Sequence, residues 1–201
     1  MDVYLIRHGQ TDGNLALRHQ HVDTELNEEG KRQIQLLTEV VAEIKPTHII
    51  TSTNLRAVET TRLIVQKCPY LIPETSSMFE ELRRPSWLTG NRFVSLVTVS
   101  YIWRWFFGYK IEGGGESYGY FLKRVIEARI YLESLPNEAR VVVVSHSVFI
   151  NFFLEHLCSD EKISFWRACR RLMKILTLQN GSVIHLKHNA LESKCDWEVV
   201  G

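Results

Sequence analysis

The chain begins with a short apolar run that leads directly into a cationic and a nucleophilic side chain. Residues 4–9 read Tyr-Leu-Ile-Arg-His-Gly, so Arg7 and His8 follow the predicted strand at once. An imidazole can attack phosphorus as a neutral nucleophile, and a guanidinium presents a permanently charged group that matches phosphate oxygens. Gly9 omits a side chain where the backbone is expected to approach other atoms closely. This segment indicates a site that handles phosphoryl groups.

Two further apolar runs end in polar or cationic side chains. Residues 48–51 lead into Ser52 and, in the first turn of the helix that should follow, Arg56. Residues 141–144 lead into His146. Free amides and the dipole at the start of a helix favour an anion. Because the carboxyl ends of parallel strands meet at one edge of a sheet, we expect these groups to converge there.

The elements that must position these residues are predicted from apolar patterns. Continuous apolar, β-branched runs are typical of strands covered on both faces, and they occur at residues 3–6, 48–51 and 141–144. Apolar residues at helical spacing predict helices from Asn27 to Pro46, from about residue 53 to Pro69, and over 116–135 and 147–157. Strands that alternate with helices imply parallel neighbours joined by right-handed crossovers.

The last part of the chain predicts a different kind of strand pairing. Residues 174–178 and 183–186 alternate around Asn180-Gly181, a two-residue turn typical of a hairpin. We therefore predict an α/β three-layer sandwich with a mostly parallel central sheet and an antiparallel edge. Residues 1–201 should form a single domain. Residues 83–115, which are rich in aromatic side chains and end in three glycines, fit the pattern worst and are interpreted as a lid or specificity insertion.

Composition argues against several other classes of protein. The formal net charge is +1, so no bulk field recruits nucleic acid or an acidic membrane. Residues 93–107, the most apolar stretch, are interrupted by Arg104 and fall short of the roughly 20 residues of a membrane span. The four cysteines show no C-x-x-C pair and are expected to be reduced. Because the first strand starts so close to Met1, we expect no leader peptide and a cytoplasmic location.

These motifs resemble those of the histidine phosphatase superfamily, also called the phosphoglycerate mutase-like proteins. The segments that carry the resemblance are Arg7-His8-Gly9 with Asn14, Leu26-Asn27 with Gly30, Thr53-Asn54-Leu55-Arg56-Ala57 with Thr60, Glu116-Ser117, and Val144-Ser145-His146. They span most of the chain, and they are specific as a set although only the first and last carry much weight alone. The resemblance implies the phosphoglycerate mutase-like fold.

The resemblance also implies a role for individual residues. His8 would be the phosphorylated nucleophile, and Arg7, Arg56 and His146 would surround the transferred phosphoryl group. The transition state spreads negative charge over the equatorial oxygens, so cations placed in advance lower the barrier. The chemistry implied in this way requires no metal ion and no other cofactor.

A general acid must protonate the leaving alkoxide, and the family uses a carboxylate in a Leu-x-Glu context. In Phe79-Glu80-Glu81-Leu82, Glu81 aligns with that carboxylate and Glu80 is the alternative. Secondary candidates for hydrogen bonds to the phosphate are Asn14, Gln20, Ser52 and Ser147. Asn and Ser at strand and helix ends equally serve as caps.

Two other groups of residues allow more than one interpretation. His19, His21 and Asp23 alternate as metal ligands could, but the spacing is weak evidence and a loop at the mouth of the pocket is the preferred interpretation. The aromatic cluster Trp103, Trp105, Phe106 and Phe107 either builds a core or contacts an apolar substrate or partner.

The expected function is a metal-independent phosphomonoesterase that acts through a phosphohistidine on a phosphorylated small molecule. One alternative is a mutase that returns the phosphoryl group to a second hydroxyl, although the short chain favours the phosphatase. The other is a phosphate-binding module with weak catalysis. The motifs are shared by phosphatases and mutases, and they leave the substrate and the oligomeric state open.

Overall fold

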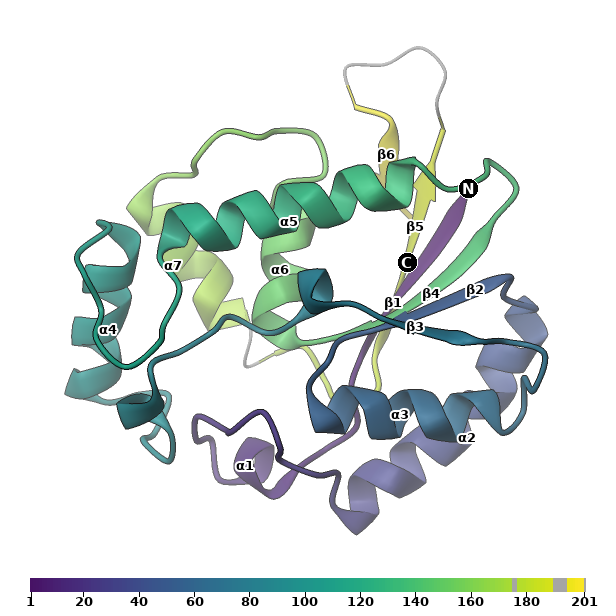
Figure 1. The fold of residues 1–201 in the computed structure, drawn as a ribbon, viewed down its shortest axis with the longest axis horizontal. Helices are drawn as coiled ribbons and strands as arrows, with labels where there is room; N and C mark the ends of the chain where they lie inside the picture. Colours follow the sequence, from purple (N-terminus) through teal and green to yellow (C-terminus); the bar gives the residue numbers. More distant parts are fainter. Residues whose placement is uncertain (175–176, 190–194, 201) are drawn as a thin grey trace.

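A mixed sheet forms the middle layer of the fold in the computed structural model, which describes residues 1–174, 177–189 and 195–200 (Figure 1). The strand order is β3-β2-β4-β1-β5-β6. The strands that run parallel are β1 (Asp2–Arg7), β2 (His48–Thr51), β3 (Pro73–Thr75) and β4 (Arg140–Ser145). Two strands form the antiparallel edge beside β1, namely β5 (Val183–His188) and β6 (Trp197–Val199). The predicted α/β class, with its mostly parallel sheet and antiparallel edge, is confirmed.

Helices cover both faces of this sheet (Figure 1). One face carries α2 (Glu28–Ile44) and α3 (Leu55–Val65), and the other carries α5 (Tyr118–Glu133) and α6 (Ser147–Glu155). The remaining helical segments are α1 (Asp12–Leu15), the 3-10 turns η1 (Ser77–Phe79) and η2 (Ser86–Leu88), α4 (Leu96–Phe106) and α7 (Phe165–Lys174). None of the helices within the described ranges combines the length and the apolar character needed to cross a lipid bilayer.

Alternating side chains of the central strands feed two separate cores. In β4, Val141 and Val143 pack with α5 and α6, whereas Val142 and Val144 pack with α2 and α3. This follows from the pleat, because successive side chains of a strand point to opposite faces. A strand buried on both faces therefore reads as a continuous apolar run, as β4 does.

The predicted helices and strands around the site are confirmed, with helix ends that differ by at most four residues from the predicted ones. Local chemistry explains the starts of two helices. The Oδ1 atom of Asn27 accepts a hydrogen bond of 2.8 Å from the amide of Gly30 and caps α2. Ser117 caps α5 in the same way by accepting from the amide of Tyr120. Each cap satisfies an amide that lacks a partner in the first helical turn.

Two predictions about the C-terminal part are wrong. Where the structure describes the strand predicted over residues 174–178, no strand is found: Lys174 ends α7 and residues 177 and 178 lie in a turn and a bend, while residues 175 and 176 are outside the described residues. The antiparallel partner of β5 is β1, and the amide of Gly181 donates to the carbonyl of Arg7 at 3.0 Å. The expectation of reduced thiols also fails for one pair, since Cys158 and Cys195 form a disulfide.

Candidate active site

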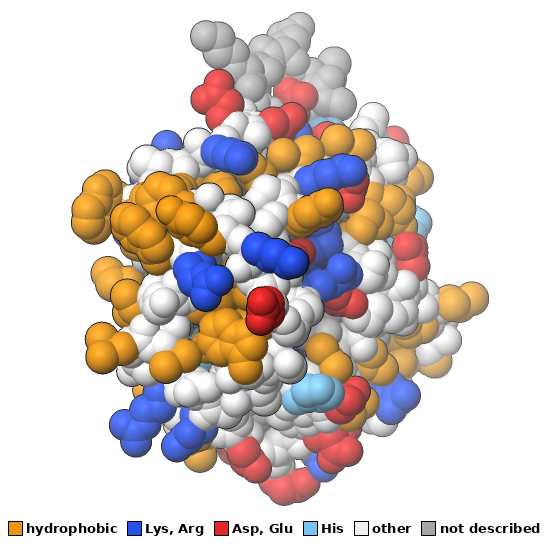
Figure 2. All heavy atoms as spheres, turned by 60° about the vertical axis from the view of Figure 1, so that its left-hand side comes forward, with side chains coloured by type: hydrophobic (Ala, Val, Ile, Leu, Met, Phe, Trp, Pro, Cys, Tyr) orange, Lys and Arg blue, Asp and Glu red, His pale blue; other side chains and the backbone are white. Residues whose placement is uncertain are grey.

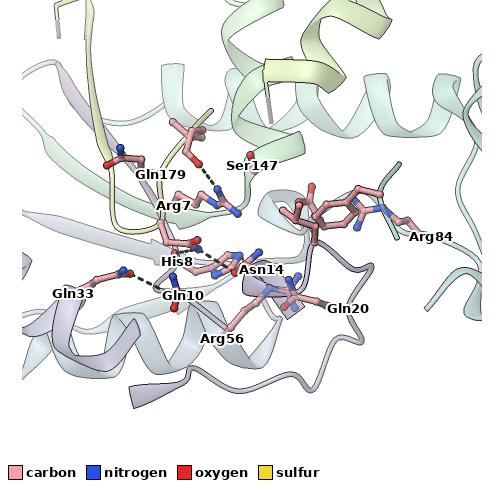
Figure 3. Close-up of a pocket in the computed structure, with 15 residues that line it drawn as sticks. Arg7, His8, Gln10, Asn14, Gln20, Gln33, Arg56, Arg84, Ser147 and Gln179 are labelled. Carbon is pink, nitrogen blue, oxygen red and sulfur yellow. Dashed lines mark hydrogen bonds between the residues drawn. The ribbon is translucent and has the colours of Figure 1, made fainter. Parts of the chain in front are cut away.

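A cavity of about 310 Å³ opens where the carboxyl ends of β1 and β4 meet the start of α3 (Figure 3). We call it the phosphate cavity. The residues predicted for the site that line it are Arg7, His8, Asn14, Gln20, Arg56, Glu81 and Ser147. These side chains come from segments far apart in the sequence, as the convergence of parallel strand ends requires.

The imidazole of His8 is held in one tautomer at the wall of this cavity. Its Nδ1 lies 2.7 Å from the carbonyl oxygen of Gly9, and since a carbonyl can only accept, Nδ1 carries the proton. The Nε2 lone pair accepts a hydrogen bond of 3.2 Å from Nε of Arg56. Burial, followed by the charges of Arg56 and Arg7, holds the pKa of His8 well below its ordinary value. His8 is therefore a neutral imidazole with its lone pair on Nε2 at neutral pH.

The backbone beside His8 is fixed by close packing. The amide of Gly9 donates to Oγ1 of Thr60 at 3.1 Å, and that hydroxyl donates to the carbonyl of Arg56 at 2.8 Å. A Cβ atom on Gly9 would lie 2.8 Å from the carbonyl oxygen of Gly30. The expectation that Gly9 permits a close backbone approach is confirmed. Thr60 connects the loop after β1 to the first turn of α3.

Two arginines bring buried positive charge to the phosphate cavity. Arg7 donates to the carbonyl of Leu178, and Nη1 of Arg56 donates to the carbonyl of His21 at 3.0 Å. Burial lowers the pKa of Arg7, and it lowers the pKa of Arg56 to about 10, while Glu81 opposes both shifts. Both guanidinium groups remain charged at neutral pH. Neither forms an ion pair with a carboxylate in the described part of the chain, so an anion in the cavity would compensate them.

His146 lies behind the cavity wall rather than in it. Its ring centroid is 5.0 Å from that of His8, and its Nε2 lies 2.7 Å from Oγ of Ser52. Burial, followed by the charge of Arg56, holds the pKa of His146 well below its ordinary value. The Nδ1 atom has no hydrogen-bond partner among the described residues. The structure thus brings both histidines together, and it uses Ser52 to orient His146 rather than to line the cavity.

Of the two adjacent glutamates, only Glu81 faces the phosphate cavity. Its carboxylate accepts hydrogen bonds from the amides of Val148 and Phe149, at 3.3 and 3.2 Å, in the first turn of α6. Glu80 forms an ion pair of 2.7 Å with Arg83 and lies outside the cavity wall. The placement favours Glu81 over Glu80 as the carboxylate that can reach a bound phosphate ester.

A buried arginine holds the segment that carries Glu81. Arg124 of α5 donates to the carbonyls of Glu80 and Glu81 at 2.7 and 3.2 Å. It also forms a buried ion pair of 2.5 Å with Glu116, whose carboxylate accepts from the amide of Arg83 at 2.8 Å. The Glu116-Ser117 motif therefore supports the loop around Glu81 instead of reaching the cavity, where it contributes no lining residue.

Asn14 and Gln20 line the cavity and also hold the loop after β1. Oδ1 of Asn14 accepts from Oγ1 of Thr11 at 2.9 Å within the cap of α1. Oε1 of Gln20 lies 2.6 Å from the same hydroxyl. The capping role and the cavity-lining role, which sequence reasoning weighed equally for Asn14, are thus combined in one residue.

Several lining residues were missed by sequence reasoning. Nδ2 of Asn180 donates to the carbonyls of His8 and Gly9 at 3.0 and 3.2 Å, although its segment was interpreted as a hairpin turn. Arg84 makes no hydrogen bond or ion pair within the described ranges, and its place in the segment 83–115 was the only signal for it. The other lining residues that were missed are Gln10, Leu17, Gln33, Phe93, Leu178 and Gln179.

The alternating histidines of the N-terminal loop do not converge on one point. Nε2 of His19 lies 3.0 Å from Oγ1 of Thr98, whereas His21 forms an ion pair of 3.1 Å with Asp23. Among the residues that the structure describes, no group of three His, Cys, Asp or Glu side chains could hold a metal ion. The contact with Thr98 ties His19 to the first turn of α4, and the ion pair of His21 stays within the loop.

Comparison with known proteins identifies a family model and several relatives that match this chain. Residues 3–194 match the model of the histidine phosphatase superfamily (branch 1). A probable phosphoglycerate mutase GpmB of Proteus mirabilis is 32% identical over 162 residues, which cover 77% of this chain and 73% of the relative. The adenosylcobalamin/alpha-ribazole phosphatase of Salmonella typhimurium is 25% identical over 173 residues, which cover 83% of this chain and 84% of the relative.

Solved structures share the same fold. A mycobacterial glucosyl-3-phosphoglycerate phosphatase in complex with VO3 superimposes with a TM-score of 0.73 and 23% identity, over 100% of this chain and 97% of that chain. A putative alpha-ribazole-5'-P phosphatase from Escherichia coli gives a TM-score of 0.74 with 19% identity, over 98% of both chains. The chain therefore belongs to branch 1 of the histidine phosphatase superfamily and is phosphoglycerate mutase-like in its fold and sequence motifs.

Proposed function

We propose that this protein is a metal-independent phosphomonoesterase that works through a phosphohistidine on His8, with Glu81 as general acid and base. The observation that supports the proposal is the state of His8, a neutral imidazole whose Nε2 accepts from Arg56 in a cavity that Arg7 and Glu81 also line. A binding module would need the cations but not the nucleophile and the acid together.

In the first step, the phosphate of the ester accepts hydrogen bonds from Arg7 and Arg56, and Arg56 exchanges its hydrogen bond to Nε2 of His8 for one to the phosphate. Nε2 of His8 then attacks phosphorus, and the bond between phosphorus and the ester oxygen breaks. A protonated Glu81 gives its proton to the leaving oxygen, so an alcohol departs. The two arginines that line the cavity stabilise the negative charge on the equatorial oxygens.

In the second step, water replaces the alcohol. Glu81, now ionised, takes a proton from the water, whose oxygen attacks the phosphorus of phosphohistidine. The bond between phosphorus and nitrogen breaks, Nε2 of His8 regains its lone pair, and inorganic phosphate leaves with Glu81 protonated again. The hydrogen bond from Nδ1 to Gly9 keeps the same tautomer through both steps.

The decisive experiment follows the phosphoryl group. The wild-type protein, mixed briefly with a ³²P-labelled phosphomonoester and quenched in alkaline denaturant, should carry label on His8 by peptide mapping. His8→Ala should lose both label and turnover, whereas His48→Ala, which changes a histidine outside the cavity, should keep both. Turnover that persists without His8, or turnover that chelators abolish in the wild-type protein, would refute the proposal.

A mutase is the second candidate, because one relative is described as a probable phosphoglycerate mutase. The two activities differ in whether water or a second substrate hydroxyl takes the phosphoryl group from His8. Measuring free phosphate and isomerised product in the same reaction separates them. We expect release of phosphate to exceed isomerisation for every substrate that phosphorylates His8.

A further inference from the structure

A second cavity of about 280 Å³, which we call the apolar groove, lies between α4 and α7. The side chains of α4 and α7 that line it include Val99, Ile102, Trp103, Phe165, Leu172 and Met173. The sequence predicts that the aromatic cluster with Trp103 and Trp105 either builds a core or contacts an apolar ligand. The structure divides this cluster between the core and the groove. Trp105 is completely buried in the core, whereas Trp103 is half exposed at the groove.

The apolar groove is continuous with the phosphate cavity. Arg84 and Phe93 line both of them. Leu82 lines the groove directly after Glu81 lines the phosphate cavity, and Val148 lines the groove directly after Ser147. A ligand bound by its phosphate beside His8 would therefore extend past Glu81 into the groove.

The groove offers little to a polyhydroxylated or charged ligand. Arg84 carries the only permanent charge in its wall among the described residues. Burial lowers the pKa of His19 to about 3, and Arg84 adds to this shift, so the imidazole is neutral at pH 7. Burial raises the pKa of the Tyr101 hydroxyl, which stays protonated. Thr98 is already occupied, because its hydroxyl donates to the carbonyl of Arg92 at 2.8 Å.

The groove is rimmed by apolar side chains that the protein leaves in water. The exposed fractions are 60% for Val99, 70% for Met173 and 79% for Val94. Figure 2 shows hydrophobic side chains gathered on the face formed by the left-hand part of Figure 1, with basic side chains between them. Exposed apolar side chains that gather on one face favour a binding surface, and here they rim a groove that shares wall residues with the phosphate cavity.

We propose that the apolar groove binds the alcohol part of the substrate, so that the preferred substrates are phosphomonoesters of apolar alcohols. This inference rests on the phosphatase function proposed above. Glu81 protonates the ester oxygen, and the carbon atoms attached to that oxygen continue toward Leu82 and Phe93 at the start of the groove. A volume of about 280 Å³ accommodates about nine methylene-sized groups at roughly 30 Å³ each.

The test is a series of linear alkyl phosphates from ethyl to octyl, kept below their critical micelle concentrations. Burial of a methylene predicts that kcat/KM rises by up to about fourfold for each added carbon until the groove is filled. Val99→Asn and Met173→Gln should flatten this rise, and both side chains are exposed, so the fold should tolerate the changes. Leu96→Gln and Val97→Asn, on the same helix but outside the groove wall, should keep it.

Binding of alkyl phosphonates, which cannot be hydrolysed, tests the groove without catalysis. Calorimetry should show the same dependence on chain length in the wild-type protein and its loss in Val99→Asn and Met173→Gln. If no ester phosphorylates His8 but the affinity for phosphonates still rises with chain length, the proposed phosphatase function is refuted, whereas binding of alkyl chains in the groove is supported. If esters are hydrolysed with a kcat/KM that does not depend on chain length, the phosphatase function is supported and the groove proposal is refuted.

Two further outcomes would overturn the groove proposal. The first is a preference for polyhydroxylated phosphate esters over alkyl phosphates whose leaving alcohols have the same pKa, if the groove variants show the same preference. It would place the alcohol in the neighbouring cavity lined by Glu80 and Arg83. The second is a changed sedimentation coefficient in the groove variants together with an unchanged dependence of kcat/KM on alkyl chain length. That result would show that a second copy of the chain covers this face.

Discussion

At the scale of single residues, the surroundings of His8 determine its chemistry more than its identity does. The hydrogen bond from Nδ1 to the carbonyl of Gly9 selects the tautomer, and burial, followed by the charges of Arg56 and Arg7, lowers the pKa so that Nε2 stays unprotonated. The same burial and the same cations act on His146. Both imidazoles are therefore neutral at neutral pH, as the nucleophile role proposed for His8 requires.

Replacement of one arginine should change the pKa of His8 in a defined direction. A cation beside an imidazole disfavours the imidazolium form, so Arg56→Gln should raise the pKa of His8 toward its ordinary value. Histidine NMR titration of the ligand-free protein measures this directly. Arg62→Gln, on the exposed side of the same helix, should leave that pKa unchanged. An unaltered pKa in Arg56→Gln would show that Arg56 does not control the protonation of His8.

The two glutamates of the Glu80-Glu81 pair should differ sharply in their effect on phosphoryl transfer. We expect Glu81→Gln to slow phosphorylation of His8 by about 10²- to 10⁴-fold with alkyl phosphates, whose alkoxides need a proton. The loss should be much smaller with p-nitrophenyl phosphate, which has a stable leaving anion. Single-turnover measurements of the phosphoenzyme isolate this step. Glu80→Gln, which breaks an ion pair with Arg83, serves as the control and should change the rate little.

At the scale of elements, the site depends on how closely the start of α2 packs against the loop after β1. A Cβ atom on Gly30 would lie 2.1 Å from the carbonyl oxygen of Gln10, which is backbone and cannot rotate away. Asn27 caps the same helix and also donates to the side chain of Gln10 at 3.2 Å. The loop that follows His8 is therefore positioned by the start of α2.

A single methyl group at this contact should separate the helix from the loop. We expect Gly30→Ala to lower the free energy of unfolding by about 1–3 kcal/mol, as overpacking does, and to reduce kcat/KM as the loop moves. Gly119→Ala is the matched control, since a Cβ there would meet its nearest atom at 3.9 Å. That change should raise the stability by about 0.4–1 kcal/mol through the unfolded state. Urea titration of both variants measures these effects, and equal stabilities would contradict the packing argument.

At the scale of the whole molecule, several histidines are buried as neutral groups. Burial is the largest cause of the lowered pKa values of His8, His19, His146 and His156. The unfolded chain protonates such residues near pH 6.5, whereas the folded protein does not until a lower pH. Acid therefore lowers the free energy of unfolding, because the unfolded state binds more protons than the folded state below about pH 6.5.

His19 allows this linkage to be measured at one position. Its pKa is about 3 in the folded protein, so its contribution to stability is constant above about pH 6.5 and is lost as the pH falls toward 3. Between pH 6 and 4.5, the free energy of unfolding should fall less steeply in His19→Gln, by about 1.4 kcal/mol per pH unit. Urea titrations at several pH values test this, and identical slopes in both proteins would show that His19 is protonated in the folded state.

The sequence by itself determined the main helices and strands of this protein and the residues that follow its parallel strands. Buried parallel strands read as continuous apolar runs, so β1, β2 and β4 could be predicted with the residues at their carboxyl ends. Caps and prolines predicted where the main helices begin and end, since these signals act over a few neighbouring residues. Parallel strand ends meet at one edge, and for that reason the approach of His146 to His8 could be expected.

Only the tertiary structure decided which distant segments complete the site. The turn at Asn180 carries the local signal of a hairpin, yet the strand β5 that follows it pairs with β1, and the side-chain amide of Asn180 contacts the backbone of His8. The sequence pattern does not distinguish the two tryptophans of α4, but packing buries Trp105 and leaves Trp103 at the groove. Burial, charge and the pairing of Cys158 with Cys195 depend on neighbours far along the chain. No local pattern encodes those neighbours, because packing in three dimensions selects them.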